Sequence, residues 1–412
     1  MTAYQGHLVC PRCSTEVEES AFMYGCPVCA AEGVPVNVHP VYELSSQAWR
    51  LDPSAPGLFE RRGMLPLPRE GPVVSLGEGR TPLLHLERTG ARLGLSRLYL
   101  KDETQNPTWS YKDRLAAVAT TKALADGADT VVVATTGNHG AATAAYAAAA
   151  GMRCVALTLA SVPLTMKVLM QAYGAEVVAL HRPPDRWSLM RLAVEQWGWV
   201  PLSGLVDPPI GSNTFGIEGY KSIAYELHEQ LGAVPDVVVV PTAYADGLTG
   251  IHRGFVDLVA LGHAESVPRM VAAEPLGPFA ASLIEGGDVP ATIEPRASVA
   301  FSIAGSVATY QGVRVLRDSG GEAVVVGDDE EIIAAQLALA ADEGLYVEAS
   351  SATAIPAVAR LAEGGLVGEN DAVVAIGTST GLKDVGATAA RLGDVPVIEP
   401  TLAALEAQLQ DG

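Results

Sequence analysis

The sequence predicts an α/β protein with mainly parallel sheets, preceded by a small segment that carries four clustered cysteines. Apolar runs rich in β-branched residues alternate with helical runs, and few polar residues interrupt the apolar runs, as in strands covered on both faces. In such folds, ligands bind at the carboxyl ends of the strands. The expected strands are residues 97–101, 129–135, 154–159, 176–180, 236–241, 270–275, 322–327 and 371–377. The clearest expected helices are residues 140–151, 220–232, 330–344 and 350–365.

Length and charge limit the possible partners. The 412 residues suit two or three domains, and 49% of them are apolar, which is enough to form large cores. The chain has 27 basic and 47 acidic residues, a net charge of −20 that repels nucleic acid and anionic lipid. No basic-then-apolar leader is evident, and no apolar run approaches the roughly eighteen residues that span a bilayer. We therefore expect a cytoplasmic protein with neither nucleic acid nor membrane as a partner.

The cysteines near the N-terminus have the spacing of a zinc ribbon. Cys10 and Cys13 form one C-x2-C pair, and Cys26 and Cys29 form a second pair after twelve intervening residues. Four thiolates suit tetrahedral zinc and leave no position open for water, so we expect a structural metal site. The alternative is two pairs of reduced thiols without a metal. Cys154 stands alone, and five cysteines do not form a disulfide framework in a chain of this size.

Lys112 is the first candidate for chemistry. It is one of six lysines and lies in the stretch NPTWSYKDR, just before an Ala-rich run. A lysine can lose its proton and attack a carbonyl carbon, whereas an arginine cannot. Lys112 is therefore a candidate nucleophile that could form an imine with an aldehyde.

Three further segments resemble parts of a ligand site. Residues 130–151 and 237–255 each read as a buried strand, a polar turn and a helix, and the start of each helix could bind an anion. Neither segment contains the G-x-G-x-x-G of a dinucleotide site. In the third, a strand ends in the hydroxyl residues Thr378, Ser379 and Thr380. Together with Lys112, these features suit pyridoxal phosphate and an amino acid.

The motifs in residues 75–390 resemble those of the fold-type II pyridoxal-phosphate enzymes, and most closely threonine synthase. The similarity rests on collinear motifs, and a ribbon precedes them in many threonine synthase-like chains. It implies two three-layer α/β domains like those of the tryptophan synthase β subunit. The motifs are LGEGRTPLLHL, NPTWSYKDR, TTGNHGAATAAYAAAAG, MKVLMQAYGAEV, TFGIEGYKSIAYEL, VEASSATA and GTSTGLKD. The implied division is a ribbon in 1–35, a large cofactor domain in 36–120 and 226–412, and a smaller domain in 121–225.

The resemblance assigns roles to individual positions. Lys112 would hold the cofactor covalently and then carry protons, with burial lowering its pKa toward the working range. Asn138 would bind the phenolic oxygen of the cofactor. Thr378 would face the pyridine nitrogen, where a hydroxyl favours elimination and replacement over transamination. Substrate contacts would come from Ser110, Thr135, Thr136, Gly137, His139 and Trp109.

The phosphate loop, Trp109 and the pair Leu115-Ala116, which stands for Gly-Met after KDR, depart from the family pattern. The phosphate loop carries few of the usual glycines, and an aspartate beside a phosphate is repulsive unless its side chain points away or caps the helix. Trp109 replaces a glycine, where it would either reshape the substrate pocket or pack between domains. The residues of the phosphate loop are Ala243, Tyr244, Ala245, Asp246, Gly247 and Thr249.

We expect His139 and His252 to be exposed or hydrogen-bonded histidines with no acid–base or metal role.

The expected activity is β- or γ-elimination and replacement on an amino acid with a phosphate-ester or similar leaving group, as in the conversion of O-phosphohomoserine to threonine. One alternative is a serine or threonine dehydratase, or a β-replacement synthase that uses O-phosphoserine, O-phosphothreonine or O-acetylserine. Another is a cofactor-binding regulator without turnover. We expect a homodimer, as well as pyridoxal 5'-phosphate and a structural zinc as cofactors.

Overall fold

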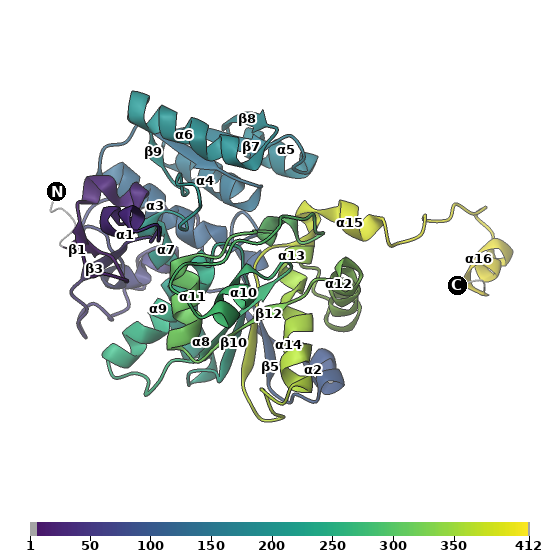
Figure 1. Cartoon of the computed structure of the whole chain (residues 1–412). Helices are drawn as coiled ribbons and strands as arrows, with labels where there is room; N and C mark the ends of the chain where they lie inside the picture. The colour runs from purple at the N-terminus through teal and green to yellow at the C-terminus, as the bar shows by residue number, and fades with distance from the viewer. Residues whose placement is uncertain (1–5, 411–412) are drawn as a thin grey trace.

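The computed structural model describes residues 6–410, which form three sheets with helices around them (Figure 1). The N-terminal sheet has the antiparallel order β2-β1-β3 and comprises β1 (Gly6–Val9), β2 (Glu16–Val17) and β3 (His39–Tyr42). The strand β3 lies beyond residue 35, the expected end of the ribbon. The N-terminal sheet therefore extends beyond the expected ribbon.

The largest sheet has the order β12-β11-β10-β13-β5-β4. Only β4 is antiparallel to its neighbour. Every residue of β10 and β13 is buried, which explains their continuous apolar sequences. The strands are β4 (Leu83–His85), β5 (Leu98–Asp102), β10 (Val237–Pro241), β11 (Arg269–Glu274), β12 (Glu322–Val325) and β13 (Val373–Gly377).

The third sheet is parallel throughout, in the order β8-β7-β6-β9. It lies with α4, α5 and α6 at the top of Figure 1, apart from the largest sheet. The expected strands are all present in these two sheets. The short strands β4 and β9 were not expected, because two or three residues carry no readable pattern. The strands are β6 (Thr130–Ala134), β7 (Arg153–Leu159), β8 (Glu176–Leu180) and β9 (Val200–Pro201).

The helices connect and cover the sheets, and none of those within residues 6–410 is long and apolar enough to cross a membrane. The helix expected over 350–365 is two helices, α13 and α14, which meet at Thr353. Pro356 lies in the first turn of α14, where a missing N–H leaves no bond unmade. The helices before β10 are α1 (Pro27–Ala31), α2 (Glu87–Leu93), α3 (Lys112–Ala125), α4 (Asn138–Ala149), α5 (Leu164–Ala172), α6 (Pro183–Trp197), α7 (Thr214–Ile217) and α8 (Lys221–Leu231). Those after it are α9 (Asp246–Ala260), α10 (Pro278–Glu285), α11 (Tyr310–Asp318), α12 (Asp329–Glu343), α13 (Ala349–Ala352), α14 (Ala354–Glu363), α15 (Val385–Ala389) and α16 (Leu402–Gln410). Short 3-10 helices span Glu19–Tyr24, Gly57–Met64, Glu103–Gln105, Glu218–Tyr220, Phe301–Ile303 and Gly381–Lys383.

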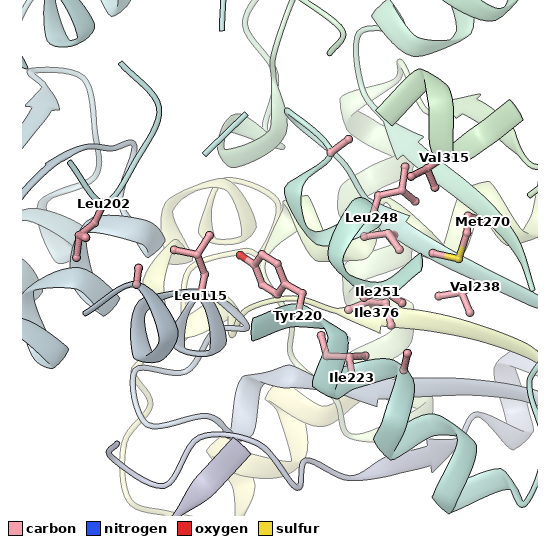
Figure 2. Packing of buried hydrophobic residues seen from close by; sticks show 14 of the residues in the cluster. Leu115, Leu202, Tyr220, Ile223, Val238, Leu248, Ile251, Met270, Val315 and Ile376 are labelled. Atoms are coloured by element: carbon pink, nitrogen blue, oxygen red, sulfur yellow. The ribbon is translucent and has the colours of Figure 1, made fainter. Parts of the chain in front are cut away.

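One hydrophobic cluster extends from the smaller sheet to the largest one (Figure 2). It runs from Leu202, just after β9, through Leu115 on α3 and Tyr220 to Met270 in β11. Because close-packed interiors resist deformation, this shared core fixes the two sheets relative to each other. Lys112 begins the helix α3 that lies within this core, so its position is fixed by packing against both sheets.

Candidate active site

The backbone around Lys112 is bound to the end of β13. Ser110 forms an isolated antiparallel bridge with Ser379, and the Tyr111 N–H donates to the Thr378 carbonyl (2.9 Å). The segment before α13 joins the same strand end, because the Glu348 N–H donates to the Ser379 carbonyl (2.9 Å). These bonds bring together three segments that are far apart in the sequence.

A cavity of about 280 Å³ lies where these segments meet the starts of α4 and α9. Most of the expected site residues line it, whereas Ser110, Gly137, Thr249 and Trp109 are not among its lining residues. The Trp109 side chain is 46% exposed, with its backbone in the left-handed region (φ 59°). The expected residues that line the cavity are Lys112, Thr135, Thr136, Asn138, His139, Ala243, Tyr244, Ala245, Asp246, Gly247 and Thr378.

The Lys112 amine lies against the rings of Tyr111 and Tyr220, with Nζ 5.0 Å and 5.7 Å from their centroids. Burial lowers the pKa of Lys112, and the carboxylates of Asp246 and Glu348 oppose this shift. A lowered pKa increases the fraction of neutral amine, the form that attacks carbonyls and accepts protons. The structure thus gives Lys112 the surroundings of a nucleophile.

Asn138 is held by three buried side chains. Its Nδ2 donates to Glu348 Oε2 (2.9 Å), and its Oδ1 accepts from Lys383 Nζ (2.9 Å) and Ser379 Oγ (3.1 Å). Burial raises the pKa of Glu348 and lowers that of Lys383 to about 8. Lys383 is therefore a second buried amine, which contacts Asn138 but does not line the cavity.

The Thr378 hydroxyl is 2.7 Å from the Ser351 hydroxyl, and both side chains are buried. Among residues 6–410, no carboxylate is hydrogen-bonded to the Thr378 hydroxyl. A ring nitrogen placed here would meet a hydroxyl, which does not hold it protonated as an aspartate would. This geometry favours loss of a leaving group over transamination.

The turn before α4 is shaped by Thr135 and Gly137. Thr135 Oγ1 accepts from the N–H groups of Gly137 and Gly140 (2.9 Å each) and so fixes the helix start. Gly137 has φ 144°, and a Cβ there would lie 2.8 Å from Met166. Only glycine fits this position. The Thr135 hydroxyl therefore stabilises the turn, and the backbone N–H groups that follow it remain available to bind an anion.

Arg186, on α6, also lines the cavity. Its Nη1 donates to the Thr135 carbonyl (2.8 Å) and its Nε donates to the Pro183 carbonyl (3.2 Å). Burial lowers its pKa, and no carboxylate pairs with it among the residues that the structure describes. A buried guanidinium without a counter-ion is costly unless a ligand supplies the negative charge.

His139 lies beside Lys112, and its ring is hydrogen-bonded to the backbone of Leu202. Its Nε2 is buried without a partner in the described part of the chain. Burial lowers the pKa of His139 to about 3, so the ring is neutral. Burial also lowers the pKa of His252, to about 4, and His252 does not line the cavity.

Comparison with known proteins agrees with this geometry. Residues 74–379 match the family model for pyridoxal-phosphate dependent enzymes, so the chain belongs to this family. It is 33% identical to the threonine synthase of Methanosarcina acetivorans over 385 residues, 92% of each chain. It is also 33% identical to the threonine synthase of Methanocaldococcus jannaschii, over 83% of this chain and 84% of that one.

The fold is that of the fold-type II members of this family. The structure of maize serine racemase matches 81% of this chain and 92% of its own, with a TM-score of 0.63 and 21% identity. The protein is a pyridoxal-phosphate-dependent lyase of threonine synthase-like type.

Unpartnered polar atoms at the cavity test whether the cofactor fits. Ser212 Oγ and Ser302 Oγ line the cavity and, like His139 Nε2, are buried without a partner in residues 6–410. Buried polar groups are normally hydrogen-bonded, so these atoms indicate a polar ligand. Lys112, Asn138 and Thr378 offer an amine, an amide and a hydroxyl to it, and the residues therefore fit the ring and aldehyde of pyridoxal phosphate. When bound, this group withdraws electrons from the substrate's α-carbon.

The N-terminal cysteines are compatible with a structural zinc. The four sulfur atoms lie within 4.8 Å of one another, with Cys10–Cys29 and Cys13–Cys26 separations of 3.6 Å. Sulfur atoms at the corners of a tetrahedron about 2.3 Å from zinc lie nearly this far apart. No disulfide joins them, and Arg12 is the basic residue between them.

Proposed function

We propose that this enzyme removes or replaces a phosphate-ester group at Cβ or Cγ of an amino acid, as in the conversion of O-phosphohomoserine to threonine. Arg186 carries this proposal, because it is a buried cation on the cavity wall with no acidic partner in the described residues. A substrate phosphate would supply that partner through charge-assisted hydrogen bonds.

The other residues then have separate tasks. We assign cofactor attachment and proton transfer to Lys112, contact with the phenolic oxygen to Asn138, and contact with the ring nitrogen to Thr378. The turn at residues 135–139 would bind the substrate carboxylate, and the loop at residues 242–249 the cofactor phosphate. In support, these groups lie around one cavity and the amine of Lys112 is buried.

Product analysis across a panel of amino acids tests the reaction. O-phosphohomoserine should yield threonine and phosphate, while Lys112→Ala should yield neither. If O-phosphoserine, O-phosphothreonine or O-acetylserine is the better substrate, the enzyme is a β-replacement synthase. If threonine yields a keto acid faster than any ester reacts, it is a dehydratase. Binding without turnover of any compound would indicate a regulator.

We also propose that the chain is a cytoplasmic homodimer divided as the sequence analysis expects. The net charge of −20 disfavours nucleic acid and anionic lipid surfaces as partners. The two parallel sheets support the division into a large and a smaller domain. The C-terminal segment supports the dimer, because it stands away from the rest of the molecule (Figure 1). Its apolar side chains, among them Val397 and Leu402, are exposed.

A further inference from the structure

Asp246 places a carboxylate where the cofactor phosphate would bind. It is the first residue of α9, which follows β10 of the largest sheet after the loop at residues 242–245, and it lines the same cavity as Lys112. Its side chain does not cap the helix. Instead, Oδ1 accepts from the Ser212 N–H (2.8 Å) and from Gln311 Nε2 (3.0 Å). The expectation that such an aspartate points away or caps its helix is thus only half met, because it stays at the cavity.

Neighbouring groups pack closely around the Asp246 carboxylate. A Cβ on Gly211 would lie 2.3 Å from Gln311 Nε2 and 2.8 Å from Asp246 Oδ1, so the backbone can approach only as glycine. The backbone of Ala245 is in the left-handed region (φ 61°), where a glycine would be unstrained. The second oxygen, Oδ2, has no hydrogen-bond partner in residues 6–410. One carboxylate oxygen is thus fixed and the other is free for a ligand.

A phosphate at the same helix start would meet two opposing effects. The free N–H groups and the dipole of α9 attract it, and Ser212 Oγ lines the cavity there without a partner in the described chain. An ionised Asp246 repels it. A protonated Asp246 instead donates a hydrogen bond from Oδ2 to a phosphate oxygen.

We propose that Asp246 takes up a proton when the cofactor phosphate binds, so that cofactor binding consumes a proton and weakens as the pH rises. Burial already raises the pKa of Asp246 in the absence of the phosphate. The inference concerns the cofactor alone and does not depend on which amino acid is the substrate.

The charged groups around Asp246 cannot replace this proton. Lys112 and Arg253 lower its pKa through their positive charges, but Lys112 is itself the residue assigned to the aldehyde. The other titratable neighbours are phenols whose pKa values burial raises, so they stay neutral. These neighbours are Tyr111, Tyr220 and Tyr244.

The test measures binding of pyridoxine 5'-phosphate, which has an alcohol in place of the aldehyde and cannot bond covalently to Lys112. Dissociation constants for wild type and Asp246→Asn are compared from about pH 7 to about pH 8.5. Ligand titration is common to both proteins, so their ratio isolates Asp246. The ratio, wild type over variant, should rise about tenfold per pH unit, as uptake of one proton requires.

Two further measurements test the proposal without relying on Asp246→Asn alone. Calorimetry of wild type in buffers of different ionisation heat should show uptake approaching one proton, and Asp246→Gly should behave like Asp246→Asn. Asp328→Asn, an exposed aspartate before α12, is the matched control and should keep the wild-type slope. Pyridoxine without phosphate should give a ratio near one. A ratio that does not change with pH, or tighter binding by wild type than by Asp246→Asn, would overturn the proposal.

Discussion

At the scale of single residues, Lys112 has the position and the lowered pKa of a residue that bonds to an aldehyde. The holoenzyme should absorb on the order of 410 to 420 nm, and borohydride should remove this band and fix the cofactor on Lys112. Lys112→Ala should lose both effects, whereas Lys167→Ala, on α5, should keep them. Peptide mapping decides the result, and label on Lys383, the buried amine that contacts Asn138, would contradict the assignment.

Arg186 allows a prediction about specificity. Arg186→Met should lower kcat/KM for a phosphate-bearing substrate roughly 10- to 100-fold, because a hydrogen bond to a charged group contributes about 1.5–3 kcal/mol. Threonine has no phosphate and should lose much less. Arg186→Lys should recover part of the loss, and Arg191→Met, on the same helix, serves as the control. Equal losses with both substrates would show that Arg186 only holds the Thr135 carbonyl.

At the scale of elements, the sequence predicted long buried strands well and contacts between segments poorly. The runs that form β10 and β13 are apolar throughout, so their burial is visible in their composition. Arg186 was missed because only the fold shows that no carboxylate faces it. The contact between Lys383 and Asn138 was not predicted for a similar reason, since 245 positions separate the two residues. The signal for Asp246 was present, as a departure from the glycines of the phosphate loop.

The C-terminal helix α16 yields a prediction at this scale. Val397 is 98% exposed, and Leu402 and Leu409 are 78% and 72% exposed. Burial of such side chains against a second copy is favourable by about 25 cal/mol per Å². Deletion of residues 393–412 should therefore reduce the mass measured by light scattering from a dimer to a monomer. Ile284→Asp, an exposed residue of α10, should leave the dimer intact. If the full-length chain is a monomer, residues 393–412 do not form a dimer contact.

At the scale of the whole molecule, the ribbon is joined to the cofactor site. Its cysteines share a hydrophobic cluster with Phe215 on α7 and with Tyr310 on α11. Asn37 Nδ2 donates to the Ser212 carbonyl (3.1 Å), and the N–H of Ser212 donates to Asp246. The metal site and the phosphate loop are therefore separated by only a few hydrogen-bonded residues.

This connection predicts that loss of zinc weakens cofactor binding. Metal affinity is folding free energy in a small ribbon, so mercurial titration of its cysteines should release one zinc per chain and unfold the segment. Asn37 would then no longer hold Ser212. Because one hydrogen bond contributes about 1 kcal/mol, the dissociation constant for pyridoxine 5'-phosphate should rise roughly fivefold. Cys154→Ser, in β7, removes the remaining cysteine and ensures that the reagent reports on the ribbon alone. If elemental analysis finds no zinc, the metal-site assignment is wrong. If zinc is released and cofactor binding does not change, the loop at Ser212 keeps its shape without the ribbon.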